Sequence, residues 1–193
     1  GVQMGRYGQA CAGNIHVHDV PLEYPTLQAA IDVAAPGDTV RVAAGTYQGT
    51  GNRNLNAGGK DLVIISVAGP ALTIIDCAMA APGILYVSGE TAAAKLSGFT
   101  IRNGRHTTGA GILCIGSAPT LENLILTGNH ALTDGGGLAC ISASPTAIDL
   151  VIADNTCVDD GAGLLCAGGA APSFQGCQLY DNTAPNRGGA VYS

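Results

Sequence analysis

The chain has 193 residues, of which 29 are glycine, 47% are hydrophobic and only 11% are charged. This composition excludes a disordered chain, and the glycines follow no three-residue period, which excludes a collagen. The net charge of −6 argues against nucleic acid as a partner, since phosphate binding needs a basic face, and it disfavours an anionic membrane surface.

The first residues predict little structure. GVQMGRYG lacks the apolar segment of a secretory signal, so the chain is expected to be cytosolic or already processed. His16 and His18 alternate in HVH, which places both rings on one side of a strand. A metal ion is conceivable there, but two ligands do not make a site.

A single amphipathic helix is predicted after Tyr24. Thr26 suits the N-cap position, and Gly37 signals the end of the segment. One apolar face of this helix would comprise Leu27, Ala30, Ile31 and Ala34. The strand DTVRVA follows, so helix and strand together suit a cap over one end of a core.

The stretch from Leu62 to Val87 is apolar except for Asp76. Gly69-Pro70 and Pro82-Gly83 divide it into pieces of strand length. The sequence therefore predicts strands here and no membrane span.

Three copies of one sequence pattern follow, beginning at Gly109, Gly135 and Gly161. Their matching positions form columns of cysteine (Cys114, Cys140, Cys166), proline (Pro119, Pro145, Pro172) and asparagine (Asn129, Asn155, Asn182). Each copy holds two short apolar segments without helical periodicity, separated by turn residues. A period near 26 with this content predicts an all-β parallel β-helix, whose coils stack at about 4.8 Å.

The columns have structural interpretations. The asparagines would stand at sharp turns, tolerate left-handed backbone and form an amide ladder; a polar binding row is the alternative. The cysteines would face inward as small hydrophobes. Cys11 with Cys77 and Cys157 with Cys177 are conceivable bridges, and the odd count of seven leaves at least one thiol unpaired or intermolecular.

One strand of each repeat is apolar at every position, so its outward side chains are apolar too. These are Leu85, Leu113, Ile115, Ile141 and Leu165, with Tyr192 in the last copy. A sheet with one solvated face should alternate apolar and polar residues. We therefore expect this sheet to be covered on both sides, by the N-terminal segment or by another subunit.

PTLQAAIDVAAPGDTVRVAAGTY resembles the N-terminal segment of right-handed parallel β-helix proteins of the pectin-lyase-like superfamily. The repeats resemble those of polymorphic outer-membrane proteins, with GGAV at 188–191 as the GGA[ILV] element and FTIRN, LTGN, IADN and LYDN standing for FxxN. The resemblance runs from about Ile15 to the end. It implies a right-handed fold that hosts lyases, hydrolases, adhesins and shafts alike.

An enzyme of this superfamily would place acids with Arg or Lys on one outer sheet face. The sequence offers Arg102 and Asp149 there, in different coils, and no pair of carboxylates spaced for glycoside hydrolysis. Acids in the turns (Asp134, Asp154, Asp159, Asp160, Asp181) could hold calcium between coils or be solvated turn residues. His106 and His130 lie in turns without a recognisable nucleophile.

We interpret residues 1–193 as one β-helix domain, with the helix and first coil in 1–50, irregular coils in 51–108 and regular coils in 109–193. The expected function is a non-enzymatic, secreted or cell-surface structural protein without cofactors, which associates with itself or adheres to surface polysaccharide. Self-association would use the outward apolar column and the last coil, around Val191 and Tyr192. The alternative is a polysaccharide lyase, glycoside hydrolase or carbohydrate-binding domain, for which Tyr180 and Tyr192 are the outward aromatics.

Overall fold

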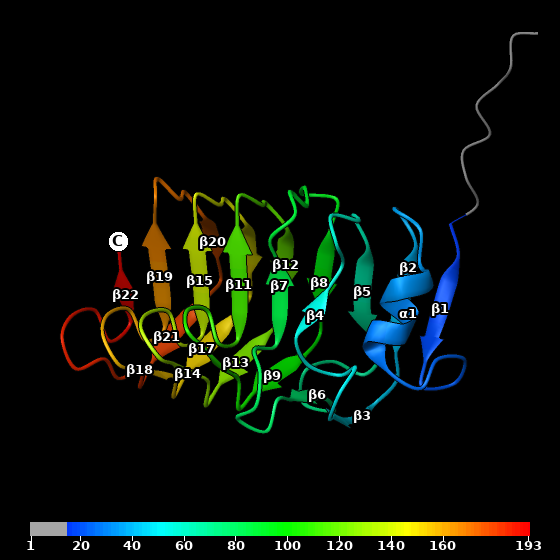
Figure 1. Cartoon of the computed structure of the whole chain (residues 1–193), viewed down its shortest axis with the longest axis horizontal. Helices are drawn as coiled ribbons and strands as arrows, with labels where there is room; N and C mark the ends of the chain where they lie inside the picture. The colour runs from blue at the N-terminus through cyan, green and yellow to red at the C-terminus, as the bar shows by residue number, and fades with distance from the viewer. Residues whose placement is uncertain (1–14) are drawn as a thin grey trace, which may run out of the picture.

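The computed structural model describes residues 15–193, which form a parallel β-solenoid of about seven turns (Figure 1). The predicted β-helix with one short helix is therefore confirmed. Each coil contributes strands to three long sheets, called A, B and C here, and the later coils add a strand to a short sheet D. All strand pairs of the named strands are parallel, as coil-on-coil stacking requires.

Sheet A lies behind sheet C in Figure 1, and sheet B runs along the lower side. In order of stacking, sheet A contains β1 (Val17–Val20), β2 (Thr39–Val42), β5 (Val63–Ser66), β8 (Lys95–Ser97), β12 (Thr120–Glu122), β16 (Thr146–Ile148) and β20 (Ser173–Gln175). Sheet B contains β3 (Gly45–Gln48), β6 (Thr73–Asp76), β9 (Thr100–Arg102), β13 (Ile125–Thr127), β17 (Val151–Ala153) and β21 (Gln178–Tyr180).

Sheets C and D complete each coil. Sheet C contains β4 (Leu55–Asn56), β7 (Ile84–Tyr86), β11 (Ile112–Ile115), β15 (Leu138–Ile141), β19 (Leu164–Ala167) and β22 (Val191–Tyr192). Sheet D contains β10 (Arg105–His106), β14 (His130–Ala131) and β18 (Thr156–Cys157). The apolar stretch from Leu62 to Val87 forms β5, β6 and β7, and no helix within residues 15–193 is long and apolar enough to cross a membrane.

The register of sheet C follows the repeat period. Ile112 pairs with Leu138 and Leu138 with Leu164, each 26 residues further along the chain. The earlier steps are longer, 29 residues from Leu55 to Ile84 and 28 from there to Ile112. Regular coils therefore begin near residue 109, because only there does the period become constant.

Alternating side chains fill the interior. Leu96, Leu121 and Ala147 stack on sheet A, and all are fully buried. Ile101, Leu126 and Ile152 do the same on sheet B. Such columns place like side chains above one another at the strand spacing, so one apolar core runs along the whole stack.

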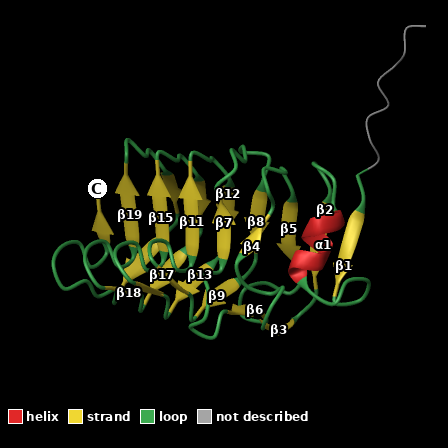
Figure 2. Ribbon diagram, viewed as in Figure 1, coloured by secondary structure: helices red, strands yellow, loops and turns green. Residues whose placement is uncertain are grey.

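Helix α1 (Leu27–Val33) lies beside β1 and β2 at one end of the stack (Figure 2). The Thr26 side chain accepts a hydrogen bond from the Ala29 N–H at 3.3 Å, as expected of an N-cap. Leu27, Ala30 and Ile31 are buried in the core. The helix ends at Val33, and Lys60 takes over its last carbonyls, donating to Ile31 O at 2.5 Å and Ala34 O at 3.0 Å.

The outer face of sheet C is covered by the chain's own turns, not by the N-terminal segment or another subunit. The turns at 107–111, 133–137 and 159–163, called the covering turns, precede β11, β15 and β19 and curl in front of them (Figure 2). A Cβ built on Gly109 would lie 2.8 Å from Leu113 Cβ, and one on Gly135 would lie 2.8 Å from Ala139 Cβ. The turn backbone therefore rests directly on the outward side chains of these strands.

Candidate functional site

An acid and two hydrogen-bond donors stand in one row on the outer face of sheet B. Gln48, Asp76 and Arg102 occupy the same position of β3, β6 and β9, so they stack on successive coils. Asp76 Oδ2 accepts from Arg102 Nε at 3.0 Å and from Gln48 Nε2 at 3.1 Å. Asp76 Oδ1 accepts from Asn103 Nδ2 and the Ala78 N–H, both at 3.0 Å.

These four hydrogen bonds decide what Asp76 can do. Burial alone would raise the pKa of this carboxyl, but the hydrogen bonds outweigh it and hold the pKa below the ordinary value of 3.8. A carboxylate offers about four acceptor positions, and here each is matched by a donor. Asp76 therefore clamps three successive coils together.

The sequence did not single out this row. It placed Arg102 outward but noted Asp76 only as a break in an apolar stretch. Their separation of 26 residues equals one regular coil, and that spacing was the available signal. Asp149, the outward acid expected on this sheet, lies before β17 with a φ of +54°, two coils beyond β9.

The turn acids form no metal centre within residues 15–193, where no group of three His, Cys, Asp or Glu side chains is placed to hold a metal ion. Asp134 Oδ1 accepts the Asp160 N–H at 2.9 Å, which links two covering turns. Asp159 accepts a hydrogen bond from Asn186. Asp160 Oδ1 is buried without a partner in the described structure.

The histidines take part in local hydrogen bonds. His18 Nε2 donates to Asp38 Oδ2 at 3.0 Å, and the His16 N–H donates to Asp38 Oδ1 at 2.9 Å. The backbone bond from His16, followed by the His18 bond, holds the pKa of Asp38 far below its ordinary value. His106 Nδ1 donates to Thr108 O, and His130 Nδ1 lies 2.8 Å from Thr156 Oγ1.

The cysteines Cys114, Cys140 and Cys166 stack in register on β11, β15 and β19. Cys114 and Cys140 are fully buried, and neighbouring thiols together with burial raise the pKa of Cys114. Burial raises the pKa of Cys166 to about 11. Thiols with raised pKa values are poor nucleophiles, so the row packs as apolar filling.

Every cysteine within residues 15–193 is a free thiol. The bridge considered between Cys157 and Cys177 is absent, because Cys157 packs with alanines beneath the covering turns while Cys177 faces the main core. Cys77 is free, and Cys11, its considered partner, lies outside the described residues.

The asparagines form a hydrogen-bonded ladder. Asn155 Oδ1 accepts from both the backbone N–H and the Nδ2 of Asn129, each at 3.0 Å. Asn182 Oδ1 accepts the same pair of bonds from Asn155, at 3.0 and 2.9 Å. At the other end, the Gly104 N–H donates to Asn129 Oδ1 at 2.8 Å. Asn129 and Asn155 are fully buried, so the row has no face open to a ligand.

The left-handed backbone expected at these asparagines lies one residue earlier. Gly128, Asp154 and Asp181 have φ values of +63°, +56° and +52°. That residue makes the sharp turn, and the asparagine after it points into the core, where its amide replaces backbone partners.

The outward apolar column of sheet C divides into two parts. Leu113 and Leu165 are only 6% exposed beneath the covering turns, and Leu85 and Tyr192 are half-buried. Ile115 is 39% exposed, and Ile141 beside it is half-buried. The accessible strip is therefore the far end of these strands, which the covering turns leave open.

The two outward tyrosines belong to different faces. Tyr180 stacks on Ala153 at the outer face of sheet B, whereas Tyr192 stacks on Leu165 in sheet C. They form no aromatic row of the kind that a carbohydrate platform would present.

Comparison with known proteins adds no family: no family model matches the chain, and no curated protein or solved structure matches it. The fold and the contacts above therefore carry the functional argument.

Proposed function

We propose that the protein is a non-enzymatic, extracellular or cell-surface β-solenoid with a structural or adhesive role, and that it associates with copies of itself. The observation that supports this is how each coil uses its polar groups. The asparagine ladder and the Asp76 row both satisfy the hydrogen bonds of a neighbouring coil. Each coil is thus a template for another coil.

The last coil presents this template to solvent. Phe174 stacks on Ala147 but is 38% exposed, and Val191 stacks on Leu164 but is 44% exposed. The side chains beneath them are at most 3% exposed. Strands β20, β21 and β22 form the edges of sheets A, B and C on this side. A coil from another copy would bury these side chains and pair these edges.

A second contact surface lies along the side of the stack. Ile115 and Ile141 offer an apolar strip on sheet C that a neighbouring solenoid could cover. Because Leu113 and Leu165 already lie beneath the covering turns, lateral contact would use the open strip alone.

The proposed location rests on resemblance. Membership of the pectin-lyase-like superfamily, with repeats like those of bacterial surface proteins, would suit a secreted or surface protein that meets polysaccharide. The GGAV and FTIRN elements support this, and the parallel solenoid is compatible with it.

Polysaccharide cleavage or binding is the second candidate, and the Asp76–Arg102 pair is the observation in its favour. It has less support, because both carboxylate oxygens already accept hydrogen bonds within the fold. Incubation with acidic and neutral polysaccharides should release no reducing ends. Release that disappears in Asp76→Asn would favour the enzyme.

Sedimentation velocity over a wide concentration range tests self-association. We expect the wild-type chain to sediment faster as concentration rises, and the double variant Phe174→Lys/Val191→Lys to remain monomeric, since burying a lysine without a partner is costly. Leu132→Lys is the matched control, because Leu132 is 41% exposed in a turn away from the last coil. It should associate as the wild type does.

Ile115→Lys separates the axial from the lateral contact. If it alone prevents association, the sheet C strip is the interface. A wild-type chain that stays monomeric at every concentration contradicts the proposal, as does association that survives both the double variant and Ile115→Lys.

A further inference from the structure

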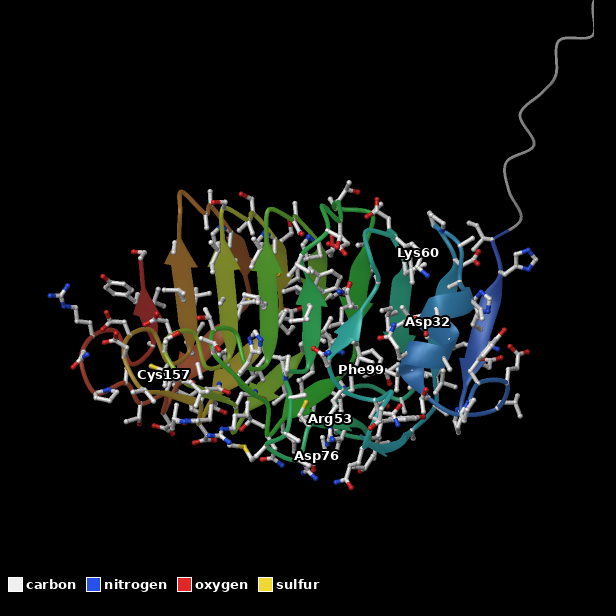
Figure 3. All side chains as sticks on the ribbon, in the orientation of Figure 1. Asp32, Arg53, Lys60, Asp76, Phe99 and Cys157 are labelled. Atoms are coloured by element: carbon white, nitrogen blue, oxygen red, sulfur yellow. The ribbon has the colours of Figure 1, made fainter. Side chains whose placement is uncertain are left out.

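A hollow of about 310 Å³ lies beside the capping helix, where α1 meets the turn before β4. It is lined by Gln28, Thr50, Gly51, Arg53, Asn54, Asn56 and Ala81. Figure 3 labels Arg53 on this side of the stack, near Asp76. Its volume is at the small end of the range for ligand sites, so it suits a small ligand.

The walls of the hollow are fixed by hydrogen bonds. Gln28 Oε1 accepts the Asn56 N–H at 3.0 Å, and Gln28 Nε2 donates to Asn56 O at 3.1 Å. The Gln28 N–H donates to Gly51 O at 2.8 Å, and the Leu27 N–H donates to Asn52 Oδ1 at 3.0 Å. The turn is therefore held to the helix before any ligand arrives, and such preorganisation lowers the cost of binding.

The side chains that remain unsatisfied all belong to one short segment. Arg53 has no carboxylate within 4 Å in the described residues, and its one hydrogen bond runs from Nη1 to Cys77 O at a long 3.4 Å. Thr50 and Asn54 make no side-chain hydrogen bond within residues 15–193. The guanidinium has five donors, and most of them are unused.

The surroundings add positive charge. The Arg105 N–H donates to Ala81 O at 3.0 Å, so a second arginine stands one coil from the hollow. Arg105 is exposed, and it too has no carboxylate within 4 Å in the described residues. In contrast, Arg41 and Arg102 are each paired with an aspartate. Two unpaired arginines therefore flank Ala81 in a chain whose net charge is −6.

We propose that this hollow binds a small oxyanion, a carboxylate, sulfate or phosphate group, either free or carried on a sugar. The Arg53 guanidinium would hold two oxygens of the anion in parallel hydrogen bonds, the geometry that favours arginine over lysine. Thr50 Oγ1 and Asn54 Nδ2 would supply further donors. The proposal is independent of self-association, since the hollow lies at the helix end of the stack.

Calorimetric titration with sodium sulfate at low ionic strength tests the site, alongside glucose 6-sulfate and glucose. We expect sulfate and glucose 6-sulfate to bind and glucose not to bind. Arg53→Gln should weaken binding about tenfold or more, because it removes a charged hydrogen-bond donor. Arg187→Gln is the matched control: it removes the same charge from an exposed arginine in the last coil and should leave binding unchanged.

A second variant guards against a folding defect. Ala81→Leu fills the hollow without changing the charge, and it should also abolish binding while the thermal melt shows a folded protein. Tighter binding of glucose 6-sulfate than of sulfate would identify a sugar-borne anion, and equal binding a free one. The proposal is wrong if sulfate does not bind, if glucose binds equally well, or if Arg187→Gln weakens binding as much as Arg53→Gln.

Discussion

At the scale of single residues, Asn155 shows how one side chain can serve two neighbouring coils. Its Nδ2 donates to Leu126 O in the coil before at 2.9 Å and to Asn182 Oδ1 in the coil after at 2.9 Å. Its Oδ1 accepts two bonds from Asn129. A fully buried amide with every position used stabilises the stack chiefly because its loss would leave several buried groups unpaired.

Asn155→Leu should therefore lower the free energy of unfolding by about 1 to 3 kcal/mol. Chemical denaturation measures the change. Asn182→Leu, on the half-buried last rung, should cost less, because solvent can replace the lost partners. Equal effects at both positions would contradict the ladder's dependence on burial.

Asp76 should make stability depend on pH. Its pKa is lowered in the folded protein, so its contribution is complete above the ordinary value of 3.8 and is lost as the pH falls through that value. Denaturation of the wild type and of Asp76→Asn at neutral and acidic pH should show a smaller loss on acidification in the variant.

Asp181→Asn is the control for that experiment, since Asp181 is exposed and asparagine tolerates its φ of +52°. Its acid sensitivity should match that of the wild type. The account of Asp76 fails if the two variants respond alike.

The sequence predicted these residue columns better than their geometry. Like residues 26 apart predict stacking directly, so the rows of asparagine and cysteine could be named in advance. The displacement of the left-handed residue to Asp154 could not, because asparagine and aspartate both tolerate that conformation. Nor could the role of Asp76, since the coils of 51–108 vary in length and obscure the register.

At the scale of elements, α1 depends on a residue distant in sequence. Its last carbonyls meet the ammonium of Lys60 rather than a glycine cap, and Gly37 lies beyond the helix end with a φ of +91°. A cation at a helix C-terminus satisfies carbonyl oxygens and favours the helix dipole.

Lys60→Met should lower stability by about 1 to 3 kcal/mol, because three carbonyls lose a charged donor. Thermal unfolding followed by circular dichroism measures it. Lys95→Met removes an exposed ion pair with Glu122 and should cost less than about 1 kcal/mol. A larger loss at Lys95 would contradict the capping role of Lys60.

The covering turns predict a contrast between two glycines. Both have left-handed backbone, with φ of +68° at Gly135 and +56° at Gly116, so alanine should cost about 1 to 2 kcal/mol at either from strain alone. A Cβ at Gly135 would also meet Ala139 Cβ at 2.8 Å, whereas at Gly116 it meets nothing within 4 Å. Gly135→Ala should therefore destabilise clearly more, as measured by denaturation; equal losses would argue against the close cover.

The elements show where sequence reasoning reaches its limit. The N-cap at Thr26 and the short strands follow from local patterns and were predicted. The missing alternation in sheet C correctly indicated a second cover, but the source of the cover could not be identified. That source depends on how Gly109 and Gly135 fold back over the strands that follow them, which is a tertiary contact without a local signature.

At the scale of the whole molecule, the two ends of the described stack differ. The helix packs Leu27 and Ile31 into the core at one end, whereas Phe174 and Val191 are exposed on the last coil at the other. A head-to-tail filament needs both ends to accept strands, and helix α1 lies beside β1, the first strand of the stack. Contact between two last coils needs only the exposed one.

The central claim is that another copy covers the last coil, and hydrogen exchange of its backbone amides tests this most directly. The N–H groups of Asn129 and Asn155 donate to the next rung of the ladder, so that of Asn182 points to where a further coil would lie. Exchange at Asn182 and Val191 should slow markedly between low and high protein concentration, while exchange at the exposed turn residue Leu132 stays constant. Unchanged exchange at Asn182 and Val191 across that range would contradict the account.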